Sequence, residues 1–302
     1  MGIKGNSMKI LVLGSLNIDR VYRVHNFVRP KETIHAQSFT CTCGGKGFNQ
    51  SIALARAGSK ITFAGIAGAD GGMLIEMLRK ESIDTSLMRQ SPNATGHTII
   101  QVSDYGENCI LVAAGANGET SKQYIHDVIT QFSEGDWILL QNEIANVDYA
   151  IEYAHACKLR VALNPSPFDD VISHRNLNYV DMLLINEVEG AELTGVAETE
   201  QILSILQTQH TNLSVLLTLG EHGAVFADSQ GIRYHVPSVP CVVKDTTAAG
   251  DTFTGYFLTS YDASRALAIA AAASSIAVSR EGAASSIPYQ GEVLAYMKQL
   301  SL

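Results

Sequence analysis

Small residues and carboxylates stand together in segment 245–252, Asp-Thr-Thr-Ala-Ala-Gly-Asp-Thr, which precedes an apolar, helix-like run. Small residues let a ligand approach the backbone, and the first amides of a helix lack internal acceptors, so this helix start can hold an anion. We expect Asp251 to accept a proton from an attacking hydroxyl while the amides of Ala248, Ala249 and Gly250 hold the transferred group. Phosphoryl transfer requires this combination. The alternative is an acid that only stabilises the helix start.

Three other segments carry residue types that would accompany such a site. Residues 44–50, Gly-Gly-Lys-Gly-Phe-Asn-Gln, enter a predicted helix; residues 186–189, Asn-Glu-Val-Glu, follow a strand-like run; and residues 282–288 are Gly-Ala-Ala-Ser-Ser-Ile-Pro. The glycine spacing of 44–50 differs from that of a P-loop. Together with 245–252, and in this order, these motifs resemble the ribokinase family, the phosphofructokinase-B-type carbohydrate kinases. The resemblance extends from about Lys9 to the C-terminal helix.

The resemblance implies an ATP-dependent kinase that phosphorylates the primary hydroxyl of a small sugar, with ribose to ribose 5-phosphate as the favoured reaction. The positions that match the family's sugar contacts are Asn17, Asp19, Gly45, Lys46, Asn49, Glu143 and Asp251. Residue chemistry alone leaves two of these assignments open. Asn17 and Asp19 follow the first predicted strand, where they could bind vicinal hydroxyls or form a capped turn. Glu143 could contact the sugar or begin an exposed helix.

The resemblance also implies a nucleotide site and two cation sites. The nucleotide positions are Asn186, Thr218, Gly220 and Gly223, and Glu189 would hold a water bound to Mg²⁺. A monovalent cation, K⁺, would be held by a cage of oxygen atoms from Asp245, Thr247, Ala277, Arg280, Gly282 and Ser286. From the residues alone, Asn186 and Glu189 stand three positions apart at a predicted helix start, so both side chains can face one ligand; the alternative is an acid that only caps the helix.

Several alternative functions stay open. A kinase for fructose, 2-keto-3-deoxygluconate or adenosine would use the same motifs, and Phe48 stands where the family commonly has a small residue, so it could pack below the site or narrow it. His97 and Thr98 could reshape the pocket as well. A non-catalytic sugar- or nucleotide-sensing protein would be expected to lose Asp251 or the glycine before it. A Rossmann dehydrogenase is excluded because the first strand ends in Gly-Ser-Leu-Asn.

Composition limits the partners. The 302 residues carry a net charge of −9, which argues against nucleic acid and anionic membrane as main partners. Five scattered cysteines indicate reduced thiols and a cytoplasmic protein, and Cys41 and Cys43 lack the companions that a zinc site needs. Residues 1–7 show no helix or strand pattern and are expected to be a disordered leader.

The elements that must position these residues alternate along the chain. Predicted strands and helices follow one another, so we expect an α/β fold: a mostly parallel sheet with helices on both faces, in one domain over residues 8–302. Segments at about 20–43 and 97–114 do not alternate, and we expect them to pair as a small antiparallel lid over the sugar site. Such a lid leaves exposed edges and often forms the dimer contact in the ribokinase family, so a homodimer is predicted.

Overall fold

The computed structural model describes residues 9–168, 177–260 and 262–300; the predicted leader, 1–7, lies outside them. Over the described part of the chain, eight strands form the main sheet. In spatial order they are β14 (Arg233–Val236), β13 (Ala224–Ala227), β12 (Ser214–Thr218), β11 (Met182–Asn186), β10 (Arg160–Asn164), β9 (Trp137–Gln141), β1 (Ile10–Leu13) and β4 (Ile61–Ala64). The strands from β12 to β4 run parallel, and β13 is antiparallel to both of its neighbours, β12 and β14.

The central strands are apolar on both faces because both faces are covered. In β1, Ile10 and Val12 join one core cluster, while Leu11 and Leu13 join the other. This alternation follows from the two-residue period of a strand, and continuous apolar runs are typical of parallel sheets. The predicted α/β fold is therefore confirmed.

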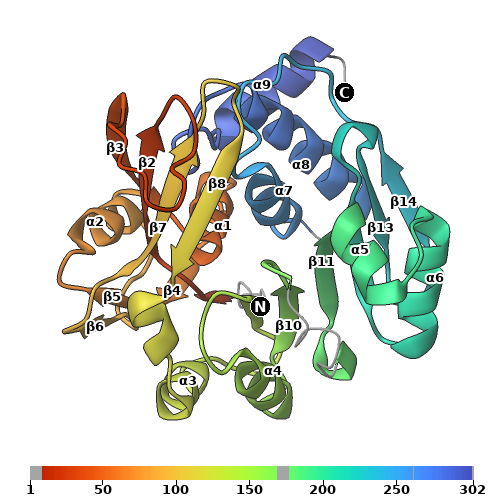
Figure 1. Ribbon diagram of the computed structural model, residues 1–302. Coiled ribbons are helices and arrows are strands. Elements are labelled where there is room, and N and C mark those ends of the chain that lie inside the picture. The colour runs from red at the N-terminus through yellow and green to blue at the C-terminus, as the bar shows by residue number, and fades with distance from the viewer. Residues whose placement is uncertain (1–8, 169–176, 261, 301–302) are drawn as a thin grey trace.

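Helices pack on each face of the sheet (Figure 1). The first cluster contains residues of α1 (Lys46–Arg56), α2 (Gly72–Lys80), α7 (Ala249–Phe257), α8 (Ala263–Val278) and α9 (Gln290–Leu300). The second contains residues of α3 (Lys122–Ile129), α4 (Val147–Ala156) and α6 (Thr199–Gln209), and Leu193 of α5 (Glu187–Thr194) packs against it. Among the described residues, no helix combines the length and apolar character needed to cross a membrane.

A second, separate sheet forms the predicted lid. Its order is β3 (Ser38–Gly44), β2 (Asn17–Arg23), β7 (Gly96–Val102) and β8 (Asn108–Ala113), and Figure 1 shows these strands on the side of α1 and α2, away from α5 and α6. Strands β2 and β3, like β7 and β8, are antiparallel. The two predicted lid segments meet at β2 and β7, and this pairing is parallel and not antiparallel. Both strands have their amino ends next to the main domain and extend away from it. A short pair, β5 (Ile66–Gly68) and β6 (Arg89–Ser91), was not predicted.

Candidate active site

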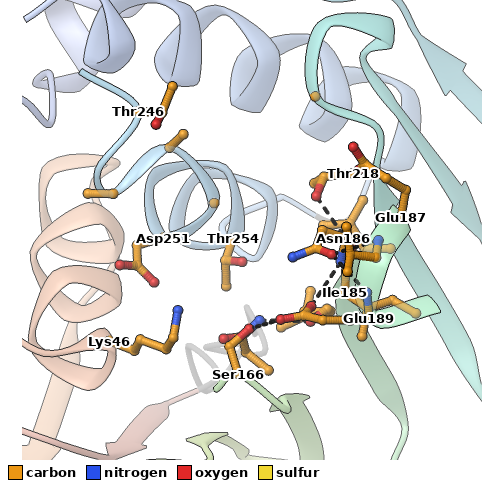
Figure 2. Close-up of a pocket in the computed structure, with 18 residues that line it drawn as sticks. Lys46, Ser166, Ile185, Asn186, Glu187, Glu189, Thr218, Thr246, Asp251 and Thr254 are labelled. Atoms are coloured by element: carbon orange, nitrogen blue, oxygen red, sulfur yellow. Dashed lines mark hydrogen bonds between the residues drawn. The ribbon is translucent and has the colours of Figure 1, made fainter. Parts of the chain in front are cut away.

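A cavity of about 540 Å³ opens at the carboxyl ends of β10, β11 and β12, beside the start of α7 (Figure 2). Carboxyl ends of parallel strands and amino ends of helices are the usual ligand-binding edge of such sheets. Predicted site residues that line this cavity are Lys46, Asn186, Glu189, Thr218, Gly220, Ala248, Ala249, Gly250 and Asp251. The structure thus brings together residues from distant parts of the sequence, Lys46 and Asp251 among them.

The first turn of α7 presents its backbone to this cavity. Ala248 caps the helix in a left-handed conformation, with φ 62° and ψ 10°. The amide of Ala249 donates to the carbonyl of Thr246 at 3.1 Å, so one of the three predicted amides already has a partner. The next amide, that of Gly250, belongs to the first turn, whose amides lack intrahelical acceptors. A Cβ added at Gly250 would meet no atom within 4 Å, which leaves open space for a ligand.

Asp251 lies in that first turn and is buried, with 8% of its surface exposed. Its Oδ2 accepts from Asn49 Nδ2 at 3.1 Å and its Oδ1 from Gln50 Nε2 at 2.9 Å. Figure 2 shows the Lys46 ammonium directed toward the space below Asp251. A carboxylate held by two amides and facing a cavity can accept a proton from a hydroxyl bound there.

Asn17 and Asp19 lie on β2, which begins at Asn17 soon after β1 ends at Leu13. Asn17 Oδ1 accepts from Asn117 Nδ2 at 2.8 Å, which directs the amide nitrogen of Asn17 away from Asn117. Asp19 Oδ1 accepts from Thr98 Oγ1 at 2.7 Å. Burial raises the pKa of Asp19, the Thr98 bond lowers it, and the charge of Glu143 raises it again, with a net increase.

Glu143 is half-buried and links the loop after β1 to the amino end of α1 through hydrogen bonds. Its Oε2 accepts from Ser15 Oγ and from the amide of Lys46, the latter at 2.9 Å. The following helix, α4, begins only at Val147, so the alternative of an exposed helix start is wrong. Gly45 caps α1 at φ 95°, where a Cβ would approach Asn17 N to 3.0 Å.

The positions predicted to contact the sugar, called the sugar-contact group below, therefore gather at the amino end of α1, next to the cavity. Asn17, Asp19, Gly45 and Glu143 do not line the cavity itself, whereas Lys46 does. Two residues that form hydrogen bonds with these positions were not predicted to do so from the sequence. Asn117, in a short 3₁₀ helix (Gly115–Glu119), orients Asn17, and no spacing in the sequence points to this contact. Thr98 was considered only for its bulk, yet it bonds Asp19.

Asn186 and Glu189 form a complete capping box on α5. Asn186 Oδ1 accepts from the amide of Glu189 at 2.9 Å, and Glu189 Oε2 accepts from the amide of Asn186 at 3.0 Å. Glu189 Oε1 also accepts from Ser166 Oγ. The capping alternative is thus confirmed, and Glu189 still lines the cavity. Among the residues that the structure describes, no cluster of three His, Cys, Asp or Glu side chains could hold a metal.

The nucleotide-loop residues border a second cavity of about 520 Å³. Thr218 ends β12, Gly220 has φ 54° and Gly223 has φ 94°. Both cavities share Thr218, Gly220 and Gly250, and the second one is also lined by apolar residues such as Val239, Phe253 and Ala271. A Cβ at Gly223 would approach Val236 O to 2.0 Å, so this turn requires glycine.

The predicted cation residues meet where the loop before α7 packs on residues 277–286. Asp245 accepts from the amides of Thr247 and Gly282, each at 2.9 Å. Burial raises the pKa of Asp245, but the bonds from Thr247 and Gly282 outweigh it, so the net pKa lies below its usual value. Ala277 O accepts from the amide of Arg280 at 3.0 Å, and Ser286 Oγ donates to Ala283 O at 2.8 Å.

Comparison with known proteins agrees with this geometry. The family profile described as pfkB family carbohydrate kinase matches residues 7–290. This chain belongs to the pfkB family of carbohydrate kinases. A ribokinase from Haemophilus influenzae is 35% identical to it over 304 residues, which cover 96% of this chain and 98% of that relative.

Two solved structures of the same family are also similar to this pfkB kinase. The Arabidopsis thaliana ribokinase complexed with ribose and ATP is 28% identical, with a TM-score of 0.85, over 97% of this chain and 99% of the other. The ribokinase from Cryptococcus neoformans var. grubii in complex with ADP is 30% identical, with a TM-score of 0.82, over 96% and 99%. The prediction of a carbohydrate kinase of the ribokinase type is confirmed.

Phe48 is completely buried in the first core cluster and lines neither cavity. Its burial in the core agrees with the expectation that it packs below the site.

Proposed function

We propose that this kinase transfers the γ-phosphoryl group of ATP to the primary hydroxyl of ribose, which gives ribose 5-phosphate. One observation carries the proposal: Asp251 is buried, held by two amide donors, and placed beside the open first turn of α7. The ribokinase names of its relatives, and the ribose and ATP in the Arabidopsis thaliana complex, support the substrates.

In this proposal Asp251 removes the proton of the attacking hydroxyl, and the backbone of Ala248, Ala249 and Gly250 faces the transferred phosphoryl group. The sugar hydroxyls are bound by Asn17, Asp19, Gly45, Lys46, Asn49 and Glu143. Asn186, Thr218, Gly220 and Gly223 contact the nucleotide, and the apolar second cavity takes its base, because a flat aromatic ring suits an apolar pocket.

Two cations fit the residues present. Glu189 and Asn186 offer hard oxygen atoms at the cavity wall, where Mg²⁺ with its waters would neutralise phosphate charge. Asp245 and Thr247, with the carbonyls of Ala277, Arg280 and Gly282 and with Ser286, would hold K⁺, since the loop contacts already gather these positions. Turnover in K⁺ that exceeds turnover in a large organic cation at equal ionic strength would support the K⁺ site, and equal turnover would contradict it.

The reaction can be tested by measuring ADP release from Asp251→Asn and wild-type protein. The amide cannot accept the hydroxyl proton, so turnover should fall by about 10²–10⁴-fold while the protein stays folded and ATP binding stays close to wild type. A folded Asp251→Asn protein with near-wild-type turnover would contradict the role of Asp251.

The substrate can be tested in the same assay with ribose, 2-deoxyribose, fructose, 2-keto-3-deoxygluconate and adenosine. Loss of one hydroxyl leaves a buried polar group unpaired, at about 1–3 kcal/mol. Ribose should therefore exceed 2-deoxyribose by about tenfold or more in kcat/KM. If fructose or adenosine is clearly preferred, ribose is the wrong substrate and only the family assignment remains.

We also infer a cytoplasmic, dimeric protein that folds as one domain over residues 8–302. The five cysteines are all free thiols, which supports a reducing compartment. The lid exposes apolar side chains, which supports association of two chains through it.

A further inference from the structure

A chain of buried amides leads to Asp251 from the strand ends beneath it. Gln50, on the second turn of α1, donates from Nε2 to Asp251 Oδ1 at 2.9 Å. Its Oε1 accepts from Nε2 of Gln141, the last residue of β9, at 2.7 Å. Both glutamine side chains are completely buried. Neither has a role in the sugar, nucleotide or cation contacts described above.

The orientation of the Gln50 amide is fixed by a group that can only accept hydrogen bonds. The carbonyl of Leu184 accepts from Asn164 Nδ2 at 2.8 Å, so Asn164 Oδ1 must face the other way. That oxygen faces Gln50 Nε2 at 3.4 Å. Gln50 therefore turns its nitrogen toward Asn164 and Asp251 and its oxygen toward Gln141. A reversed amide would place an oxygen against the carboxylate of Asp251, which is repulsive.

The carboxylate of Asp251 is consequently held from two positions of one helix. Asn49 binds Oδ2 and Gln50 binds Oδ1, and these donors come from adjacent residues of α1. The torsion that turns an aspartate carboxylate is broad, so one bond alone would leave the group free to rotate. Two bonds to separate oxygens fix its plane.

The amides orient Asp251 without adding charge. The charged side chains that line the same cavity are Lys46, Glu187 and Glu189. A charged donor in place of Gln50 would alter the electrostatics of a cavity that takes a polyphosphate, whereas a neutral amide does not. Glutamine at position 50 can therefore orient the Asp251 carboxylate without adding a charge beside it.

We propose that Gln50, oriented by Gln141 and Asn164, is a positioning residue that fixes the Asp251 carboxylate for proton transfer. The proposal rests on the proposed role of Asp251 as the general base. In this proposal Gln141 at the end of β9 and Asn164 at the end of β10 orient Gln50, and the Leu184 carbonyl of β11 orients Asn164. These groups act on Asp251 through Gln50.

The test compares Gln50→Met, Gln141→Met and the double variant, because methionine keeps the volume and removes the amide. In Gln50→Met, kcat should fall about tenfold or more, while the Kd values for sugar and ATP stay within about twofold. Gln141→Met should lower kcat less. Since Gln141 acts through Gln50, the double variant should be no slower than Gln50→Met alone. Multiplied effects in the double variant would overturn the relay.

Gln50→Glu gives a second readout, which a purely structural role would not move. It places a carboxylate against Asp251, and like charges favour protonation, so the acid limb of the pH profile of kcat should move to higher pH. An unchanged acid limb would overturn the proposal.

The matched control is Gln207→Met on α6. Gln207 is partly buried and lines neither cavity, and its Nε2 donates to the carbonyls of Leu213 at 3.1 Å and Asp228 at 2.6 Å. It should lower the unfolding temperature and leave kcat unchanged; an equal loss of kcat would mean that Gln50→Met acts through stability, and would overturn the proposal. If Asp251→Asn is inactive and Gln50→Met keeps full kcat, this inference fails and the proposed function stands. An active Asp251→Asn would remove the proposed function itself.

Discussion

At the scale of single residues, Asp19 illustrates a conflict between ligand binding and stability. Its side chain is half-buried beside Thr98; burial and the charge of Glu143 raise its pKa, although the hydrogen bond from Thr98 lowers it. An acid whose pKa is higher in the folded state gives stability that is fully present below its unfolded pKa, about 3.9, and that is lost as pH rises through the folded value. In the ligand-free protein at neutral pH, the ionised Asp19 therefore destabilises the fold. A sugar that donates hydroxyls to it would offset this cost.

Asp19→Asn should accordingly stabilise the ligand-free protein and weaken sugar binding. The amide oxygen can still accept from Thr98, and no charge is buried. We expect the unfolding temperature at pH 7 to rise by roughly 2–4 °C, the shift that about 1 kcal/mol produces in a large domain. The difference should shrink as the pH falls toward 4, because the raised pKa lets Asp19 take up its proton in the folded state before it would in the unfolded chain. Thermal unfolding at both pH values, with sugar titrations, measures this; a lower unfolding temperature at pH 7 would contradict it.

At the scale of elements, α7 carries two glycines with opposite purposes. Gly250, in the first turn, lines both cavities, and a Cβ there would meet nothing within 4 Å. Gly255, in the middle of the helix, packs on α1, and its added Cβ would lie 2.3 Å from Ala53 Cβ. The first glycine leaves room for a ligand, and the second lets two helices approach closely.

The matched pair Gly250→Ala and Gly255→Ala separates these purposes. Gly250→Ala should raise stability by about 0.5–1 kcal/mol, as alanine favours a helix, and lower kcat/KM for ATP by about tenfold or more because its methyl group enters the phosphate space. Gly255→Ala should cost about 1–3 kcal/mol through overpacking. Denaturant unfolding and ADP release measure both. Equal ATP kinetics in Gly250→Ala and wild type would show that no phosphate approaches this turn.

Many helices and strands could be predicted from the sequence, because short apolar runs such as 10–13 and the alanine-rich run 263–278 directly indicate buried elements. The two helices at the site were expected to begin at Phe48 and Phe253, but α1 begins at Lys46 and α7 at Ala249. Their first turns consist of small and polar residues that face the site and show no apolar period. Helix α6 was not predicted, and only Ile202, Leu203 and Leu206 of it are buried.

Side-chain contacts between elements that are distant in the chain could not be predicted from the sequence. The bonds from Gln50 to Asp251 and from Asn117 to Asn17 join residues separated by 201 and 100 positions, and only the packing of α1, α7 and the lid defines them. Residue identity indicates that an amide can bond, but the fold decides with which partner.

At the scale of the whole molecule, the lid leaves apolar surface exposed. Strand β8 is an edge of the lid sheet, and its Ile110, Leu111 and Val112 are 52%, 65% and 59% exposed. On the other edge strand, β3, Phe39 is 52% exposed and lies against Tyr22. A small sheet with apolar edges favours pairing with another chain. Because Val112 pairs with Thr98, which bonds Asp19, a second chain on this sheet would also cover the sugar-contact group.

We therefore expect a homodimer that depends on the lid. Light scattering at micromolar concentration should give twice the chain mass of 32.4 kDa. The double variant Ile110→Glu with Leu111→Glu adds charge to both faces of β8 and should give a monomer, because two buried like charges would be unpaired. Its affinity for the sugar should fall as well, since the sugar-contact group loses its cover. Tyr105→Glu is the control: Tyr105 is 78% exposed in the turn between β7 and β8, so the dimer should persist. A monomeric wild-type protein, or a dimer that survives the double variant, would place the association elsewhere or remove it.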